Sequence, residues 1–459
     1  MTKPFNPAIR DFLDGRIWLR MHTPFPCEEI NALIGDGHLQ TIKGIESKPS
    51  FFNQKRKFCN RCENDDPTRF TTFNCAKCEG PCTYCRHCLK MGRVSSCTEL
   101  IVWNGEKPEY PTNHTIAWRG TLTPHQQKAS DELTASQEKR ASHLIYAVCG
   151  SGKTEILFPP IHKLLTEGKR VCIAAPRVDV IHELEPRLSA AFPETKIEAL
   201  YGGAQPTMEA SQLVLATTHQ LYRFRHAFDA VFVDEADAFP YKADITLQRA
   251  VKKAVKPGFP VHYVTATPSD KLLSGIQRTG YVSIINRRYH GHPLPVPKFV
   301  PLWNYEKQIR KGKLPRKLID WTEQRLAKKE PFLIFFHHIG LMEEAEPLFQ
   351  LIDPRIRSVH ASHPDRKEHV QALRNKELPG LLTTTILERG ITIPNVQVAV
   401  VGAEQQIFDK GALIQIGGRV GRSADYPTGD FILFHNGITY AMDDAKAEID
   451  KLNKGGVRT

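Results

Sequence analysis

The segment Ala147-Val148-Cys149-Gly150-Ser151-Gly152-Lys153-Thr154 indicates a phosphate-binding loop, because it follows an apolar run and precedes a helix-like stretch. In such a loop, glycines let backbone amides surround a phosphate group, a lysine reaches the β- and γ-phosphates, and a hydroxyl can ligate Mg²⁺. ATP and Mg²⁺ are therefore the expected ligands of the loop residues Gly150, Ser151, Gly152, Lys153 and Thr154. Ala147 replaces the leading glycine of the general pattern. Pro159 and Pro160 follow soon afterwards, so we expect the next helix to be short or kinked.

Apolar, strand-like runs alternate with helix-like stretches around this loop, which predicts an α/β fold with parallel sheets of the doubly wound type. The first group of runs covers residues 143–148, 170–175, 213–217, 230–233 and 261–265. The stretch HGHPLPVPKFVP at residues 290–301 cannot form a helix or a central strand, and is expected to be an extended linker. Beyond it, further strands are expected at residues 332–336, 356–359, 381–385, 396–402 and 431–434. Two similar α/β domains in tandem are therefore predicted.

Two charged segments complete the predicted catalytic site. The run Val231-Phe232-Val233 leads into Asp234-Glu235-Ala236-Asp237, which puts carboxylates at the end of a buried strand. We expect Asp234 to hold Mg²⁺ through its water shell and Glu235 to orient and deprotonate the attacking water. In the second domain, the segment from Gln415 to Arg422 carries Arg419 and Arg422 three residues apart, a spacing typical of one helical face. Such arginines neutralise charge on the transferring phosphoryl group, so hydrolysis would require the two domains to close on each other.

Together with further short segments, these motifs resemble the ordered motif series of DEAD-type helicases of superfamily 2, across residues 118 to 435. The resemblance implies two RecA-like lobes, at residues 110–290 and 291–459. It also implies that Gln126 contacts adenine, with Gln127 as the competing residue, and that Thr265 and Thr267 couple hydrolysis to lobe movement. Contacts to a nucleic-acid backbone would come from Arg177, Thr217, Thr218 and Thr384. The other segments that carry the resemblance are 122–126, 174–177, 216–220, 234–237, 265–267, 383–385 and Glu388-Arg389-Gly390.

Eight of the eleven cysteines lie between Cys59 and Cys97, a region that is expected to bind zinc. A Cys-x₂-Cys knuckle directs two thiolates at one tetrahedral ion, and two knuckles make a closed structural site. His87 lies between the cysteines as an alternative ligand. Eight cysteines can supply two full sites, but their spacing alone leaves the pairing open. We expect a zinc module at residues 51–105, after an N-terminal region at residues 1–50 in which we identify no motif.

The segment from Tyr84 to Val94 resembles the zinc module of the ComFA family, the late-competence ATPases of transformable bacteria. There a four-cysteine finger directly precedes the helicase core, as it does here. The resemblance implies a main zinc site made of Cys59, Cys62, Cys85 and Cys88. The remaining cysteines go beyond that pattern, and a second zinc is the favoured interpretation over free buried thiols for Cys75, Cys78, Cys82 and Cys97.

The ComFA resemblance also implies ATP-driven movement of single-stranded DNA into the cytoplasm during natural transformation. The partners would be the companion protein ComFC and the membrane DNA-uptake channel, and the chain would lie at the inner face of the membrane. Alternatives are a replication-restart helicase similar to PriA, whose cysteines interrupt the helicase region, and an ATP-switched DNA-binding scaffold that never translocates. A net charge of +12 suits a polyanionic partner, and no apolar stretch is long enough to span a bilayer.

Overall fold

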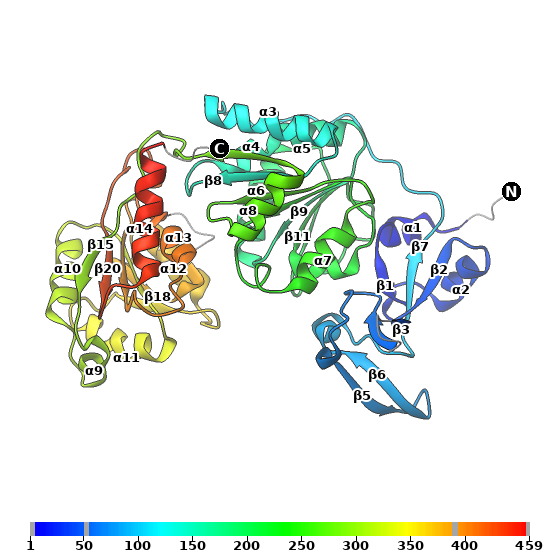
Figure 1. The fold of residues 1–459 in the computed structure, drawn as a ribbon, viewed down its shortest axis with the longest axis horizontal. Coiled ribbons are helices and arrows are strands. Elements are labelled where there is room, and N and C mark those ends of the chain that lie inside the picture. Colours follow the sequence, from blue (N-terminus) through cyan, green and yellow to red (C-terminus); the bar gives the residue numbers. More distant parts are fainter. Residues whose placement is uncertain (1–4, 50–54, 388–392, 456–459) are drawn as a thin grey trace.

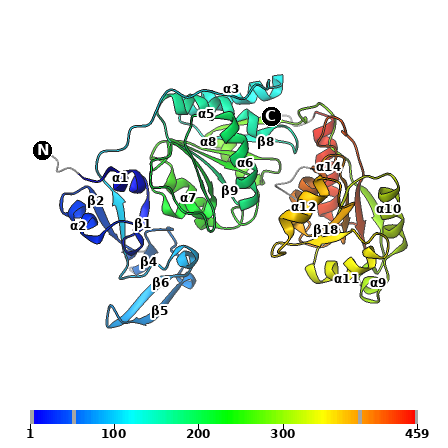
Figure 2. The same ribbon diagram turned by 180° about the vertical axis from the view of Figure 1, so that it is seen from behind.

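Three units lie side by side in the computed structural model, which describes residues 5–49, 55–387 and 393–455 (Figure 1). They are an N-terminal unit, a first lobe built around a seven-stranded sheet, and a second lobe built around a six-stranded sheet. The N-terminal unit lies on the side of the first lobe away from the second lobe, as the reverse view also shows (Figure 2). The predicted fold class, two RecA-like α/β lobes behind a small cysteine-rich module, is therefore confirmed.

The N-terminal unit is a small sheet with two hairpin extensions. Strand β7 lies at the centre of a three-stranded sheet, between β1 and β2, and is antiparallel to both. The predicted boundary at residue 50 falls between β3 and β4, which pair with each other, so the two segments 1–50 and 51–105 share paired strands. The elements are α1 (Pro7–Leu13), β1 (Ile17–Leu19), α2 (Cys27–Gly35), β2 (Leu39–Lys43), β3 (Ile45–Pro49), β4 (Lys55–Cys59), β5 (Phe70–Cys75), β6 (Gly80–Cys85), η3 (Arg86–Met91) and β7 (Glu99–Trp103).

The sheet of the first lobe is entirely parallel and has the strand order β10-β11-β9-β12-β13-β8-β14. Alternate residues of the central strands face opposite sides, so α3, α5 and α6 pack on one face and α7 and α8 on the other. Its strands are β8 (His143–Ala147), β9 (Val171–Ala175), β10 (Ile197–Leu200), β11 (Leu213–Thr217), β12 (Ala230–Asp234), β13 (Val261–Thr265) and β14 (Tyr281–Ile285). Its helices are α3 (Pro124–Glu138), α4 (Lys153–Ile156), α5 (Phe158–Thr166), α6 (Val178–Ala191), η4 (Thr218–Arg223), α7 (Ile245–Ala254) and α8 (Asp270–Thr279).

The helix after the phosphate loop is short, as the prolines predict. Helix α4 ends at Ile156, and α5 begins at Phe158 with a proline in its first turn, where a missing backbone N–H costs no intrahelical hydrogen bond.

The second lobe has a parallel sheet in the order β15-β20-β19-β16-β18-β17. The proline-rich stretch is a linker only as far as Pro297, because its last four residues form β15 at the sheet edge. The elements are β15 (Lys298–Pro301), α9 (Tyr305–Arg310), α10 (Arg316–Ala327), β16 (Phe332–Phe336), α11 (Ile339–Gln350), β17 (Arg357–Val359), α12 (Arg366–Arg374), β18 (Gly380–Thr383), η5 (Thr385–Leu387), β19 (Gln397–Val401), α13 (Lys410–Gly417), β20 (Phe431–His435) and α14 (Tyr440–Asn453).

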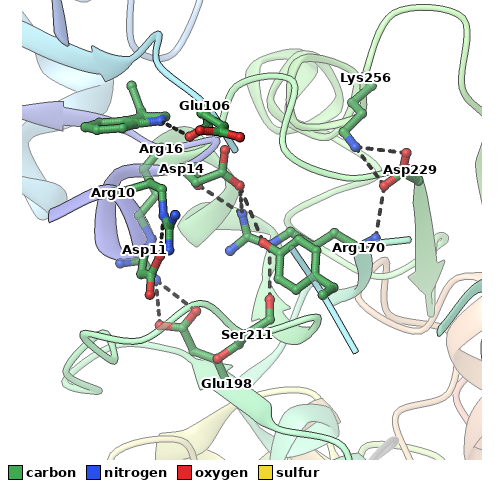
Figure 3. A network of polar contacts seen from close by, with 12 residues as sticks. Arg10, Asp11, Asp14, Arg16, Glu106, Arg170, Glu198, Ser211, Asp229 and Lys256 are labelled. Atoms are coloured by element: carbon green, nitrogen blue, oxygen red, sulfur yellow. Dashed lines mark hydrogen bonds and ion pairs between the residues drawn. The ribbon is translucent and has the colours of Figure 1, made fainter. Parts of the chain in front are cut away.

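A buried ionic network attaches the N-terminal unit to the first lobe (Figure 3). The Arg16 guanidinium lies 2.6 Å from the Glu198 carboxylate, and both side chains are almost fully buried. Arg170 donates to the Asp14 carbonyl at 2.9 Å and to the Ser211 carbonyl at 3.0 Å. Buried charges are stable only when they are paired and hydrogen-bonded, so this network fixes how the two units sit against each other.

Candidate nucleotide and metal sites

The phosphate loop lies between the end of β8 and the start of α4, at the carboxyl edge of a parallel sheet. Gly150 and Gly152 have φ angles of 80° and 74°, in the region that only glycine adopts without strain. A Cβ on Gly152 would also lie 2.4 Å from the Gln126 side-chain nitrogen. The loop therefore requires glycine at this position, and its amides precede a helix N-terminus, where anions bind.

The two predicted carboxylates follow β12 beside this loop. Lys153 Nζ lies 3.2 Å from Glu235 Oε1, which belongs to the carboxylate that we expect to activate water. Glu235 has a φ angle of 52°, a conformation that is uncommon for a residue other than glycine and that recurs at functional turns. Burial, and then the neighbouring Glu235 charge, raise the pKa of Asp234 to about 7. A divalent cation at this carboxylate would relieve both effects.

Gln126 contacts the phosphate loop. Its side chain completes a capping box with Thr123 at the start of α3, and its amide donates to the Ser151 carbonyl at 2.7 Å. The competing residue, Gln127, is exposed and donates to Asp131 at 2.8 Å. Gln126 lines the cavity beside the phosphate loop, hereafter the nucleotide cavity, and Gln127 does not. This difference favours Gln126 for the predicted adenine contact.

Both predicted arginines of the second lobe reach the same cavity as the phosphate loop. This cavity has a volume of about 560 Å³ and is lined by Lys153, Thr154, Asp234, Glu235, Arg419 and Arg422. Burial, and then the charge of Arg422, lower the pKa of Arg419 to about 9. The prediction that the pair lies on one helical face is wrong, because α13 ends at Gly417 and both arginines follow in a turn that includes Gly421, with a φ angle of 68°.

Thr265 and Thr267 contact the acidic segment directly. Both hydroxyls donate to the Asp237 carboxylate, and the Thr267 amide donates to the Thr265 hydroxyl at 3.1 Å. The strand end after β13 is thereby tied to the segment that carries Asp234 and Glu235. The role of Thr265 and Thr267 in coupling hydrolysis to lobe movement stays a prediction.

The residues predicted to contact nucleic acid are less accessible than expected. Thr217 and Thr218 are 5% and 0% exposed, at the point where β11 passes into η4. The Arg177 guanidinium crosses to the second lobe and donates to the Ile386 carbonyl at 2.7 Å. Thr384 is half-buried, and Glu388, Arg389 and Gly390 lie outside the described residues. The structure thus brings these segments of the two lobes together but leaves their contact to a strand as a prediction.

Several contacts at this site were not predicted. Two aromatic side chains, Trp118 and Tyr289, line the nucleotide cavity, where a ring can stack on a purine base. The two lobes also touch directly, because the Cys149 thiol donates to Gln415 at 3.0 Å and the Tyr146 hydroxyl to Glu448 at 2.7 Å. Cys149 lies in the phosphate-loop motif and Gln415 in the arginine motif. Their place in these motifs was the only sequence signal that they could meet between the lobes.

The eight cysteines form two groups of four, and in each group the sulfur atoms lie within 4.8 Å of one another. The first cluster is Cys59, Cys62, Cys85 and Cys88, all buried, and the second cluster is Cys75, Cys78, Cys82 and Cys97. Tetrahedral zinc with bonds of about 2.3 Å needs sulfur atoms about 3.8 Å apart. The closest sulfur pairs lie 3.5 and 3.7 Å apart in the first cluster and 3.6 and 3.9 Å apart in the second. Both groups fit zinc, and His87 belongs to neither.

The fold and the site define an ATP-dependent helicase-type ATPase of superfamily 2. Residues 119–270 match the model for the res subunit of type III restriction enzymes, and residues 313–424 match the helicase conserved C-terminal domain. Residues 2–102 match the N-terminal domain of competence protein ComFA. The chain is 41% identical to competence protein ComFA of Bacillus subtilis, over 98% of this chain and 96% of that protein. It is 40% identical to the Streptococcus pneumoniae protein of that name, over 89% and 93%. The chain therefore belongs to the ComFA family.

Solved helicase structures share the fold of the two lobes. Saccharomyces cerevisiae Dbp5 bound to RNA and ADP-BeF₃ matches 72% of this chain and 91% of its own, with a TM-score of 0.52 and 15% identity. Mycobacterium smegmatis Lhr bound to single-stranded DNA and AMP-PNP matches 74% of this chain and 49% of its own, with a TM-score of 0.54 and 16% identity. Within the described ranges, no helix is both long and apolar enough to cross a membrane.

Proposed function

We propose that this chain uses ATP hydrolysis to move single-stranded DNA into the cytoplasm during natural transformation. Membership of the ComFA family supports a role in competence, and the helicase-type lobes support an ATP-dependent motor. The observation that carries the proposal is the shared cavity, in which Arg419 and Arg422 of one lobe face Lys153 and Glu235 of the other. Turnover would then depend on the distance between the lobes, and a strand bound across both would control it.

The residues act in the following way in this proposal. The loop amides, Lys153 and Thr154 would hold the ATP phosphates, and Thr154 and Asp234 would hold the Mg²⁺ that accompanies them. With nucleotide bound, Lys153 would contact the phosphates, and the Glu235 carboxylate would take a proton from the attacking water. Arg419 and Arg422 neutralise the charge on the transferring phosphoryl group. Gln126 holds the adenine, and Arg177, Thr217, Thr218 and Thr384 contact the strand backbone.

Zinc in both cysteine clusters would stabilise the cysteine-rich part of the N-terminal unit, because few apolar residues are available there to form a core. We also propose that the chain works at the inner face of the membrane, with ComFC and the DNA-uptake channel as partners. ComFA-family membership supports these partners.

The deciding experiment measures the ATPase rate of the full chain alone and with single-stranded DNA, single-stranded RNA or duplex DNA, at low and moderate salt. We expect single-stranded DNA to raise the rate most. Lys153→Ala, the control, should have almost no turnover with any nucleic acid, since it lacks the cation on the transferring phosphate. A rate that no nucleic acid changes would contradict the motor and favour an ATP-switched scaffold.

A further inference from the structure

The first cysteine cluster lies against η4 and α7 of the first lobe. Helix η4 begins at Thr218, one of the residues that we propose to contact the nucleic-acid strand. Cys59, Cys62, Cys85 and Cys88 share one apolar core with Tyr222 of η4 and with the buried face of α7. Helix α7 lies on the side of the first lobe that faces the N-terminal unit (Figure 1). The cluster is therefore part of the interface between the two units.

Lys253 of α7 joins the two sides of this interface. Its side chain is buried, and its ammonium group donates to the Arg61 carbonyl in the cluster and to the Tyr222 carbonyl in η4, the latter at 3.1 Å. A buried ammonium is stable only when acceptors satisfy its donors. The position of the lysine therefore holds these two carbonyl groups close to the same point.

The cluster side of this contact is fixed by Arg61, which lies in the knuckle between Cys59 and Cys62. Its guanidinium donates to the Cys88 carbonyl at 2.9 Å and to the Met91 carbonyl at 3.0 Å. One side chain thus spans both knuckles, and a metal ion on the four thiolates would lock them in this arrangement.

The lobe side of the contact leads directly to the predicted strand-binding residues. Tyr222 lies in η4, which begins at Thr218, immediately after Thr217 ends β11. The Tyr222 hydroxyl is also 2.6 Å from the Thr246 hydroxyl, so η4 is bound to α7 through its side chain as well as its main chain. Any shift of the Tyr222 carbonyl would move η4, a short helix whose first residue is Thr218.

We propose that Lys253 is a positioning residue, through which the metal-loaded first cluster holds Thr217 and Thr218 in place for a nucleic-acid strand. The cluster thereby sets the DNA affinity of the first lobe rather than its chemistry. The inference rests on the proposed function for the role of these two threonines.

The test compares Lys253→Met with Lys252→Met, a matched control that alters an exposed lysine of the same helix. Both variants should keep the zinc content and the basal ATPase rate of the natural chain. Lys253→Met should need about tenfold more oligothymidylate for half-maximal stimulation, because a hydrogen bond from a charged donor is lost, while its rate at saturating DNA is unchanged. Hydrogen exchange at residues 217–223 should be faster in Lys253→Met alone.

Natural DNA dependence and natural exchange in a zinc-replete Lys253→Met protein would overturn the proposal. If Lys253→Met loses zinc or unfolds, Arg249→Ala decides, because Arg249 makes a second, partly exposed link from α7 to the Glu63 carbonyl at 2.8 Å and to Asp65 at 2.7 Å. It should show the same changes at about threefold, and natural behaviour would again refute the role. If the natural chain is not stimulated by DNA, the proposed function fails, and the exchange measurement still decides the positioning role.

Discussion

At the scale of the residue, His262 shows what a buried titratable group does to stability. It lies in β13, stacks on Phe232 at 5.0 Å, and neither ring nitrogen has a hydrogen-bond partner among the described residues. Burial, and then the charge of His143, lower its pKa to about 3. The folded chain therefore keeps His262 neutral at pH values where the unfolded chain, with a pKa of about 6.5, takes up a proton. Stability must fall as the pH drops below about 6.5.

His262→Phe should remove one part of this pH dependence. From pH 7.5 to 5.5, one such histidine lowers the free energy of unfolding by about 1.4 kcal/mol. The fall in the free energy of unfolding over this pH range should therefore be smaller in the variant than in the natural chain by about 1.4 kcal/mol. Urea unfolding at the two pH values measures it. His22→Phe, at an exposed histidine, should behave like the natural chain. An equal loss in the natural chain and His262→Phe would contradict the assignment.

Residues inside motifs were the predictable part of the site, because their chemistry requires particular side chains at fixed spacing. Lys153, Asp234, Glu235, Arg419 and Arg422 all line one cavity, as the motifs indicate. Trp118 and Tyr289 line it as well, but aromatic residues are common in any core, and only the path of the chain brings these two to the loop. The Arg61 and Lys253 contact was unpredictable for the same reason, since it joins residues 192 positions apart.

At the scale of the element, strands buried on both faces were predicted, while three of the four edge strands of the two lobe sheets were missed and β17 was found. Strands β8, β9, β11, β12, β13, β16 and β19 are buried at every position, which leaves a continuous apolar run in the sequence. Strands β10, β14 and β15 lie at sheet edges, and each has positions that are partly or fully exposed. The pairing of the cysteines was likewise decided by strand pairing: β5 and β6 pair from Phe70–Cys85 to Cys75–Gly80, which brings Cys82 to the Cys75–Cys78 knuckle of the second cluster.

The cluster elements make a prediction about metal. The natural chain should hold two zinc ions, because the four sulfur atoms of each cluster all lie within 4.8 Å of one another. Cys78→Ser, at an exposed ligand of the second cluster, should hold one ion and keep the ATPase rate. Cys62→Ser should also hold one ion and keep the ATPase rate, and it should make the segment around Arg61 sensitive to protease. Cys27→Ser, at an exposed cysteine outside both clusters, should keep two ions. Metal analysis that finds a single ion in the natural chain would leave the second cluster as free thiols.

At the scale of the whole molecule, residues of both lobes line the nucleotide cavity. Within the described ranges, the N-terminal unit lies against the first lobe and on the side away from the second (Figures 1 and 2). Contacts such as Arg177 to the Ile386 carbonyl and Arg366 to Asp179, at 2.8 Å, cross between the lobes. A strand that spans both lobes would add to these contacts and favour the closed arrangement. The N-terminal unit would then move with the first lobe as one body.

Arg422→Ala separates the effect of lobe closure on ATP hydrolysis from the binding of the strand. The variant should bind single-stranded DNA with natural affinity but lose most of the DNA-stimulated turnover, because it removes a cation from the cavity and none from the strand. Binding to single strands weakens with added salt at a logarithmic slope of about 0.7 per phosphate contact, and Arg422→Ala should keep that slope. Fluorescence anisotropy across a salt series, paired with ATPase rates, measures both. Arg316→Ala, at an exposed arginine of the same lobe, should retain stimulation. A slope reduced by about 0.7 in Arg422→Ala would instead make Arg422 a phosphate contact of the strand, and the arginine role in hydrolysis would be wrong.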